Sequence, residues 1–261
     1  MSRTLLPDWV LFHVPHDSVE IPDDCRELFV LTDEEMEREL IRMTDLHTHE
    51  LFARGVSPDR VFRFPVSRLL VDPERFPDDR EEPMAAKGQG AVYLAASDGR
   101  RLKRALSAIE RNYLMERYYF PHHGHLTDGV HAALARYGRV LIVDCHSFSS
   151  VPLPLEPCQQ RCRPQICIGT DPFHTPKELA AGLRDMFRSA GMSVGMDEPF
   201  SGSLTPILHY RHDRRVASVM LEVRRNLYED EANGMKKAGF SDVADALRDA
   251  VACAADIFSR M

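Results

Sequence analysis

The sequence lacks the features that would place a protein in a membrane or in a secreted class. No stretch approaches the roughly 20 consecutive apolar residues that are needed to cross a bilayer. An acidic residue, Asp8, precedes any long apolar run. We therefore expect no membrane segment, no secretion signal and a cytoplasmic location. No internal repeat or low-complexity tract is visible either, so a repeat architecture is not expected.

Positive charge is also scarce. Lysine and arginine number 33 against 40 aspartate and glutamate, which gives a net charge of −7, and the basic residues are scattered among acidic ones. No basic stripe is available to neutralise a phosphate backbone, so we expect no nucleic-acid partner. The 261 residues, 44% hydrophobic and 28% charged, have an ordinary globular composition. They predict one domain over residues 1–261.

The six cysteines show no paired C-x-x-C spacing. The densest group is Cys158, Cys162 and Cys167, whose spacing matches no common zinc pattern. In a chain without a secretion signal, cysteines are usually reduced. We interpret all six as free thiols, and we favour a structural or incidental role for this group over metal binding.

Short apolar runs alternate with helical patterns along the chain. This alternation predicts an α/β fold: a three-layer α/β/α domain around a central mixed, largely parallel sheet. The predicted strands cover residues 9–14, 60–66, 139–145, 165–169, 192–196 and 216–223. The predicted helices cover residues 33–54, with Thr32 as N-cap, 99–137, broken near Phe120 and Pro121, 176–190 and 241–259.

Polar residues stand at the carboxyl ends of three predicted strands, where open α/β sheets place their sites. His16 follows the first strand, His146 ends the most apolar one, and Glu222 lies within the strand at 216–223. A catalytic zinc usually takes three protein ligands, mostly imidazole and carboxylate. Asp144 or a backbone carbonyl could hold the second nitrogen of such an imidazole. One strand-end histidine is usually an ordinary residue, but two with a buried carboxylate favour a metal site.

Glu222 is open to two interpretations. Its neighbours Met220, Leu221 and Val223 predict burial, and a buried carboxylate without a partner has a raised pKa, which suits a general base. The alternative is a structural ion pair with Arg224 or Arg225.

Several arginines flank these segments, namely Arg68, Arg75, Arg224 and Arg225. A guanidinium group can bind a carboxylate through two parallel hydrogen bonds, so the cluster favours a small anionic substrate. Any single arginine could equally be a solvated surface residue. The loop around Ser201 and Gly202 has the small residues of a segment that could close over a ligand.

A set of motifs in fixed order resembles the N-formylglutamate amidohydrolase family. The resemblance runs from about residue 10 to about residue 230, and ordered agreement over many segments is more specific than one short motif. The motifs are Pro15-His16-Asp17-Ser18, Asp45-Leu46-His47-Thr48, Ser67-Arg68-Leu69-Leu70-Val71-Asp72-Pro73-Glu74-Arg75, Pro121-His122-His123, Asp144-Cys145-His146-Ser147, Pro199-Phe200-Ser201-Gly202 and Leu221-Glu222-Val223-Arg224.

The family is itself similar to the zinc carboxypeptidases, so the resemblance implies a zinc-carboxypeptidase-like (phosphorylase/hydrolase-like) fold and a Zn²⁺ or other divalent ion. It implies His16 and His146 as metal ligands and Glu222 as the general base. The carboxypeptidase pattern has a glutamate three residues after the first histidine, and here Val19 stands there. We expect Asp45 to be the third ligand instead, with Asp17 and Glu20 as alternatives.

The remaining matched positions imply substrate contacts. These would come from Arg68, Arg75, His123, Ser201, Gly202 and Arg224, while His122 and His123 could orient the substrate or a water. His47 and His49 are expected to be non-ligands, since alternating helix positions face different sides. The implied substrate is N-formyl-L-glutamate, in a step of histidine degradation. The alternatives are a deacylase or small peptidase of different acyl specificity, and a metal-free binding module on the same fold.

Overall fold

The computed structural model describes residues 6–261. Its main sheet contains β1 (Val10–Val14), β2 (Val61–Arg63), β3 (Val140–Phe148), β4 (Ile166–Gly169), β5 (Val194–Met196) and β6 (Val216–Arg224), and a small hairpin contains β7 (Glu229–Asp230) and β8 (Met235–Lys236). The α-helices are α1 (Asp33–Met43), α2 (Thr48–Ala53), α3 (Ala108–Leu114), α4 (Phe120–Tyr137), α5 (Lys177–Ser189) and α6 (Phe240–Ser259).

The six-stranded sheet has the order β2-β1-β3-β6-β4-β5. Neighbouring strands are parallel except β4 and β6, which are antiparallel. The predicted α/β fold with a mixed, largely parallel sheet is therefore confirmed. Because β1, β3 and β6 run the same way, their carboxyl ends meet at one edge, and the register there pairs His146 with Glu222.

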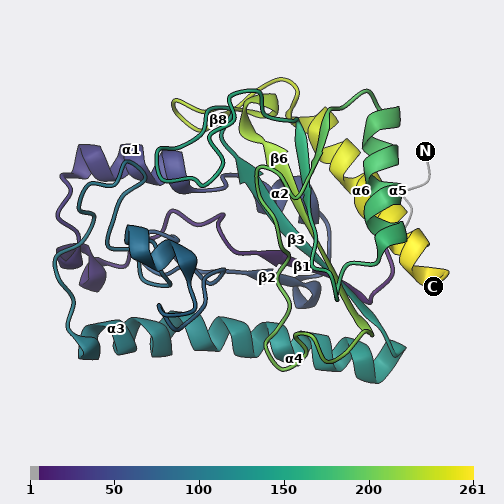
Figure 1. Ribbon diagram of the computed structural model, residues 1–261, viewed down its shortest axis with the longest axis horizontal. Helices are drawn as coiled ribbons and strands as arrows, with labels where there is room; N and C mark the ends of the chain where they lie inside the picture. Colours follow the sequence, from purple (N-terminus) through teal and green to yellow (C-terminus); the bar gives the residue numbers. More distant parts are fainter. Residues whose placement is uncertain (1–5) are drawn as a thin grey trace.

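Helices cover both faces of the sheet, as Figure 1 shows. On one face α4 packs Leu126 and Val130 against Leu11 and Ile142 of the strands. On the other face α2, α5 and α6 bury the larger apolar cluster. Because β3 is covered on both sides it is buried along its whole length, and its first four residues, Val140 to Val143, are apolar accordingly.

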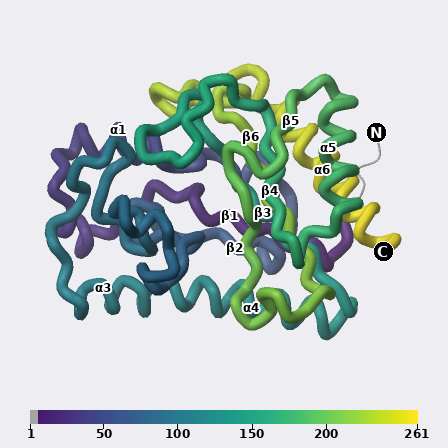
Figure 2. The backbone as a smooth tube through the Cα atoms, in the orientation of Figure 1, coloured from purple at the N-terminus to yellow at the C-terminus, as the bar shows by residue number. Residues whose placement is uncertain are grey.

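A third apolar cluster lies outside the sheet. It joins α1 to the long segment between β2 and α4, with Phe64, Leu70 and Tyr93 fully buried in it. In Figure 2 these purple, blue and teal segments lie together at one end of the sheet. Asp72 follows Val71 of this cluster, and its Oδ1 lies 2.8 Å from His16 Nε2.

The single helix predicted over residues 33–54 is wrong. Thr32 caps α1 with a capping box, as expected, but α1 ends at Met43 and α2 begins at Thr48. Between them His47 has a left-handed backbone (φ 69°). The Asp45 amide donates to the His16 carbonyl at 2.9 Å instead of to a helical carbonyl. This tertiary hydrogen bond takes Asp45 out of the helix and places it beside β1.

The two helices predicted with a break near Phe120 and Pro121 are confirmed in part: α3 and α4 are separate α-helices and α4 begins at Phe120, but a π-helical segment joins them, so the chain stays helical there. The helical run begins at Ala108, after the Ser107 capping box, and not at residue 99 as predicted, and it continues through Pro121 to Tyr137. A wider π-helical segment, Met115–Tyr119, precedes the proline. Such a segment shifts the hydrogen-bond register, so the missing amide proton of proline can be tolerated without a break.

No helix among residues 6–261 is long and apolar enough to span a membrane.

Candidate metal site

Three side chains from separate segments meet at the carboxyl edge of the sheet. His16 follows β1, His146 lies near the end of β3, and Asp45 lies in the turn between α1 and α2. Their exposed fractions are only 2%, 5% and 1%, respectively. The three, called the metal group below, are close enough for each to offer one ligand atom to a common ion.

The distances in this group suit a divalent metal ion. Asp45 Oδ2 lies 3.5 Å from His16 Nδ1 and 3.3 Å from His146 Nδ1. Two ligand atoms bound to a tetrahedral zinc at about 2.1 Å would be about 3.4 Å apart. His16 Nδ1 is buried and has no hydrogen-bond partner. Because buried polar atoms are normally paired, this atom is suited to bind an ion.

A carboxylate holds the second nitrogen of each imidazole. His16 Nε2 lies 2.8 Å from Asp72 Oδ1, and His146 Nε2 lies 3.1 Å from Asp144 Oδ1. An ionised carboxylate only accepts, so each Nε2 carries the proton and donates. In the neutral imidazole the lone pair is then on Nδ1, which faces Asp45. Histidines that bind a metal usually donate their other ring N–H to a carboxylate in this way.

Asp45 is held in its charged form. Burial would raise its pKa, but the nearby imidazoles of His146 and His16 and the charge of Arg225 keep it well below the ordinary value. Arg225 donates to Asp45 Oδ1 at 2.6 Å, to the Arg42 carbonyl at 2.6 Å and to Ser147 Oγ at 3.1 Å. Asp45 Oδ2 therefore remains available on the side of the two imidazoles.

Glu222 lies beside this group. Its β6 position pairs with His146 across the strands, and paired residues of adjacent strands project to the same side about 4.8 Å apart. Burial raises its pKa to about 8; attraction to His146 opposes this rise, and repulsion from Asp45 adds to it. Its Oε2 is buried without a hydrogen-bond partner. No ion pair of Glu222 with Arg224 or Arg225 is found in the described part of the chain.

Asp72 connects the metal group to the predicted substrate arginines. Its Oδ2 accepts from Arg68 at 2.9 Å and from the Tyr93 hydroxyl at 2.6 Å, and Arg75 Nε lies 3.6 Å away. The Nε atoms of Arg68 and Arg75 are buried and have no hydrogen-bond partner. Both guanidinium groups therefore lie near the imidazole of His16, and each has an N–H group that makes no hydrogen bond.

The other predicted substrate residues are spread more widely. His123 Nε2 donates to the Pro73 carbonyl at 2.9 Å, and burial, with the charge of His13, lowers its pKa to about 4. Arg224 donates to Asn226 Oδ1 at 2.9 Å and to the Arg163 carbonyl at 2.6 Å. These contacts give both residues a structural role, and substrate binding by either stays a prediction.

The loop with Ser201 and Gly202 reaches the site through its backbone. Ser201 is exposed and Gly202 partly exposed. Farther along the loop, the Leu204 amide donates to Asp144 Oδ2 at 2.9 Å. The loop thus packs against the carboxylate behind His146.

The two alternative third ligands lie elsewhere. Asp17 Oδ2 is 3.2 Å from Arg63 Nε and 3.4 Å from the His49 amide, while Glu20 is exposed. His47 Nε2 donates to the Gly234 carbonyl at 2.8 Å. Neither His47 nor His49 belongs to the metal group, and none of the cysteines does. The arrangement favours Asp45.

Sequence reasoning missed a second polar group behind the first, formed by His13, Glu74 and Asp144. His13 Nδ1 lies 2.9 Å from Asp144 Oδ1 and 3.1 Å from Glu74 Oε1. Burial would lower the pKa of His13, but hydrogen bonds to Asp144 and Glu74 raise it to about 9. The available signal was register, since β1 and β3 place His13 opposite Asp144.

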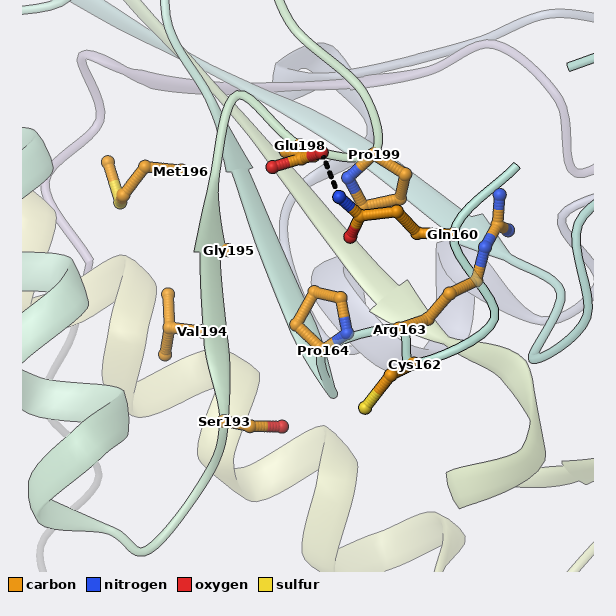
Figure 3. Close-up of a pocket in the computed structure, with 10 residues that line it drawn as sticks. All are labelled: Gln160, Cys162, Arg163, Pro164, Ser193, Val194, Gly195, Met196, Glu198 and Pro199. Atoms are coloured by element: carbon orange, nitrogen blue, oxygen red, sulfur yellow. Dashed lines mark hydrogen bonds between the residues drawn. The ribbon is translucent and has the colours of Figure 1, made fainter. Parts of the chain in front are cut away.

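Two hollows lie near the sheet. One of about 310 Å³ follows the edge strand β5, and Figure 3 shows Gln160, Arg163 and Glu198 among its lining residues. No predicted site residue lines it. The other, of about 300 Å³, is lined by Arg42, Arg225 and Glu229 and is therefore next to Asp45 through the Arg225 side chain.

Known proteins share this sequence pattern and this fold. The model of the N-formylglutamate amidohydrolase family matches residues 9–229. The crystal structure of N-formylglutamate amidohydrolase from Ralstonia eutropha JMP134 is similar, with a TM-score of 0.82 and 21% identity over 98% of this chain and 95% of that one. A gene product of Agrobacterium tumefaciens gives a TM-score of 0.70 and 20% identity over 97% and 95% of the two chains. At such identities the likeness shows the fold. No curated protein matches.

Proposed function

Since the chain belongs to the N-formylglutamate amidohydrolase family, we propose that it hydrolyses the C–N bond of N-formyl-L-glutamate, or of a similar N-acyl amino acid, with a divalent metal ion, zinc in the first place. The products are formate, or another acid, and the free amino acid. The observation that carries the proposal is the buried meeting of His16, Asp45 and His146 at ligand spacing. A cytoplasmic location and a role in histidine degradation extend the same proposal.

His16 Nδ1, Asp45 Oδ2 and His146 Nδ1 would hold the ion. When bound, it would supply Lewis acidity toward a carbonyl oxygen and toward water. Its positive charge would also favour the ionised form of Glu222, whose pKa burial raises to about 8. Asp72 and Asp144 keep the two imidazoles in the tautomer that suits this role.

Glu222 is the proposed general base. Its buried Oε2 has no hydrogen-bond partner, so it is free to accept a proton from the attacking water. The same carboxyl would return the proton to the nitrogen of the departing amine. Arg68 and Arg75 would bind the substrate carboxylates through their free N–H groups. His123, Ser201, Gly202 and Arg224 complete the proposed substrate contacts.

The metal is tested by its stoichiometry and the substrate by a small panel. Protein purified without chelator should contain or take up one zinc ion per chain. The zinc-loaded protein should release formate from N-formyl-L-glutamate faster than it deacylates the N-acetyl and N-succinyl derivatives of glutamate and aspartate. Faster turnover of another compound would establish the alternative deacylase, and a chain that takes up no divalent ion would instead be a metal-free binding module.

Two variants separate the proposed roles. Glu222→Gln keeps the shape of the side chain, so we expect metal content to be unchanged while kcat falls by about 10²- to 10⁴-fold. His146→Ala removes a ligand, and both metal and activity should be lost. Normal turnover by Glu222→Gln would mean that the base lies elsewhere.

A further inference from the structure

A chain of buried polar side chains continues behind His146, away from the metal group. His146 Nε2 lies 3.1 Å from Asp144 Oδ1, which lies 2.9 Å from His13 Nδ1. His13 Nε2 lies 2.9 Å from Nε2 of His122 on α4. Asp144 and His13 are fully buried, and His146 and His122 are 5% and 6% exposed. Three hydrogen bonds therefore join α4 to a proposed metal ligand.

The proton positions in this chain follow from its acceptors. His13 Nδ1 faces only carboxylate oxygens, those of Asp144 and Glu74, so it carries a proton and donates. Nε2 of His13 and Nε2 of His122 face each other, so one proton lies between them. Asp144 Oδ1 thus receives two donors, one from His146 and one from His13.

The chain leaves Asp144 little freedom to rotate. Its Oδ2 accepts from the Leu204 amide at 2.9 Å, while Oδ1 is held by the two histidines. His13 is held in turn from β1 by the strand and from α4 by His122. The His122 ring packs against the rings of His13 and Phe64, with centroids 5.1 and 5.0 Å apart.

We infer that His13 is a positioning residue for the metal site, acting through Asp144 on His146, and that His122 fixes His13. The inference rests on the proposed metal site. His13 does not reach the metal group itself, so its loss would leave all three ligands present. What would change is the orientation of Asp144 and of the His146 ring. Outer partners of this kind typically change metal affinity by about 10- to 100-fold.

The test compares zinc affinity in three variants. His13→Leu removes the contacts of the ring with Asp144, Glu74 and His122. We expect the Kd for zinc, measured by competition with a chromophoric chelator, to rise about 10- to 100-fold. His13→Asn places an amide N–H near the position of Nδ1, so it should restore much of this loss. His125→Leu is the matched control on α4, since this exposed side chain contacts the Phe62 ring and is not one of the hydrogen-bonded side chains between His122 and His146. Its Kd should equal that of the wild type.

The free energy of unfolding of each variant, measured in chelator, separates a structural role of His13 from a positioning role. A structural role lowers this free energy without metal, whereas a positioning role changes the Kd for zinc. Equal zinc Kd values for the wild type and His13→Leu would overturn the inference and leave the metal site intact. The same holds if His13→Asn is as weak as His13→Leu, because the hydrogen bond to Asp144 would then not be the cause. Two zinc ions per wild-type chain, one lost in His13→Leu, would mean that His13, Glu74 and Asp144 bind an ion themselves. Failure of the wild type to bind zinc would instead overturn the proposed function, and this inference with it.

Discussion

The ion pair between Arg225 and Asp45 offers a quantitative test of how the site is held together. Both side chains are buried, at 5% and 1% exposure, and their closest atoms are 2.6 Å apart. Removing one partner of such a pair leaves an uncompensated buried charge, which costs about 3 to 5 kcal/mol. The positive charge of Arg225 is therefore expected to stabilise the metal-free protein through Asp45.

The loss in the free energy of unfolding can be divided between the contacts of the two side chains. Arg225→Met loses the pair and three further hydrogen bonds, to the Arg42 carbonyl, to Ser147 Oγ and, at 3.4 Å, to the Ser147 carbonyl. The two shorter ones are worth about 1 kcal/mol each. We expect it to cost about 5 kcal/mol of the free energy of unfolding. Asp45→Asn leaves the guanidinium without its counter-charge and should cost about 3 kcal/mol. The double variant has no buried charge left unpaired, so it should cost about 3 kcal/mol less than the sum.

Urea unfolding in the presence of chelator measures the free energies of the wild type, the two single variants and the double variant without a contribution from bound metal. Arg225→Lys, which keeps the charge but not the forked donor, should lie between the wild type and Arg225→Met. If the two single effects add in the double variant to within about 0.5 kcal/mol, as they do for independent sites, Arg225 and Asp45 do not stabilise each other.

Three further predictions concern stability. Gly129→Ala should destabilise the protein by about 1 to 3 kcal/mol, because a Cβ there would lie 2.1 Å from the buried Phe62 ring. In the control Gly124→Ala, on the same helix, the new Cβ meets no atom within 4 Å, so this variant should be neutral or stabilising. Equal urea midpoints for the two variants would contradict this. Burial raises the pKa of Glu229 from 4.5 to about 8, so its contribution to stability is present below pH 4.5 and is lost as pH rises to about 8. The free energy of unfolding of Glu229→Gln should thus rise relative to that of the wild type by about 1.4 kcal/mol per pH unit in that window. A difference between the two that does not change with pH would contradict this. Thr32→Ala removes the cap of α1 and should cost about 1 kcal/mol in thermal unfolding, with no loss showing that the cap contributes nothing.

Much of the fold could be predicted from local pattern. Buried strands such as β3 need apolar residues on both faces, and that need is visible in the sequence without knowledge of neighbours. The start of α1 was also readable, since the capping box at Thr32 is a local interaction, whereas the start of α3 at Ala108 was placed too early, at residue 99. Helix ends were less so. Asp45 leaves the helical path because its amide bonds to the carbonyl of His16, a partner 29 residues away that no local pattern reveals.

The same division applies to the candidate site. The sequence by itself placed His16, His146 and Glu222 at strand ends, since the carboxyl edge of a parallel sheet gathers such residues whatever the detailed packing. Its resemblance to a family supplied Asp45. The sequence also offered Asp144 as one possible partner of an imidazole. Only the tertiary structure decided which partners act on them: Asp72 behind His16, Asp144 behind His146, Arg225 behind Asp45, and His13 behind Asp144. Hydrogen bonds between distant segments depend on register and distance, and neither is encoded in the spacing of residues along one strand.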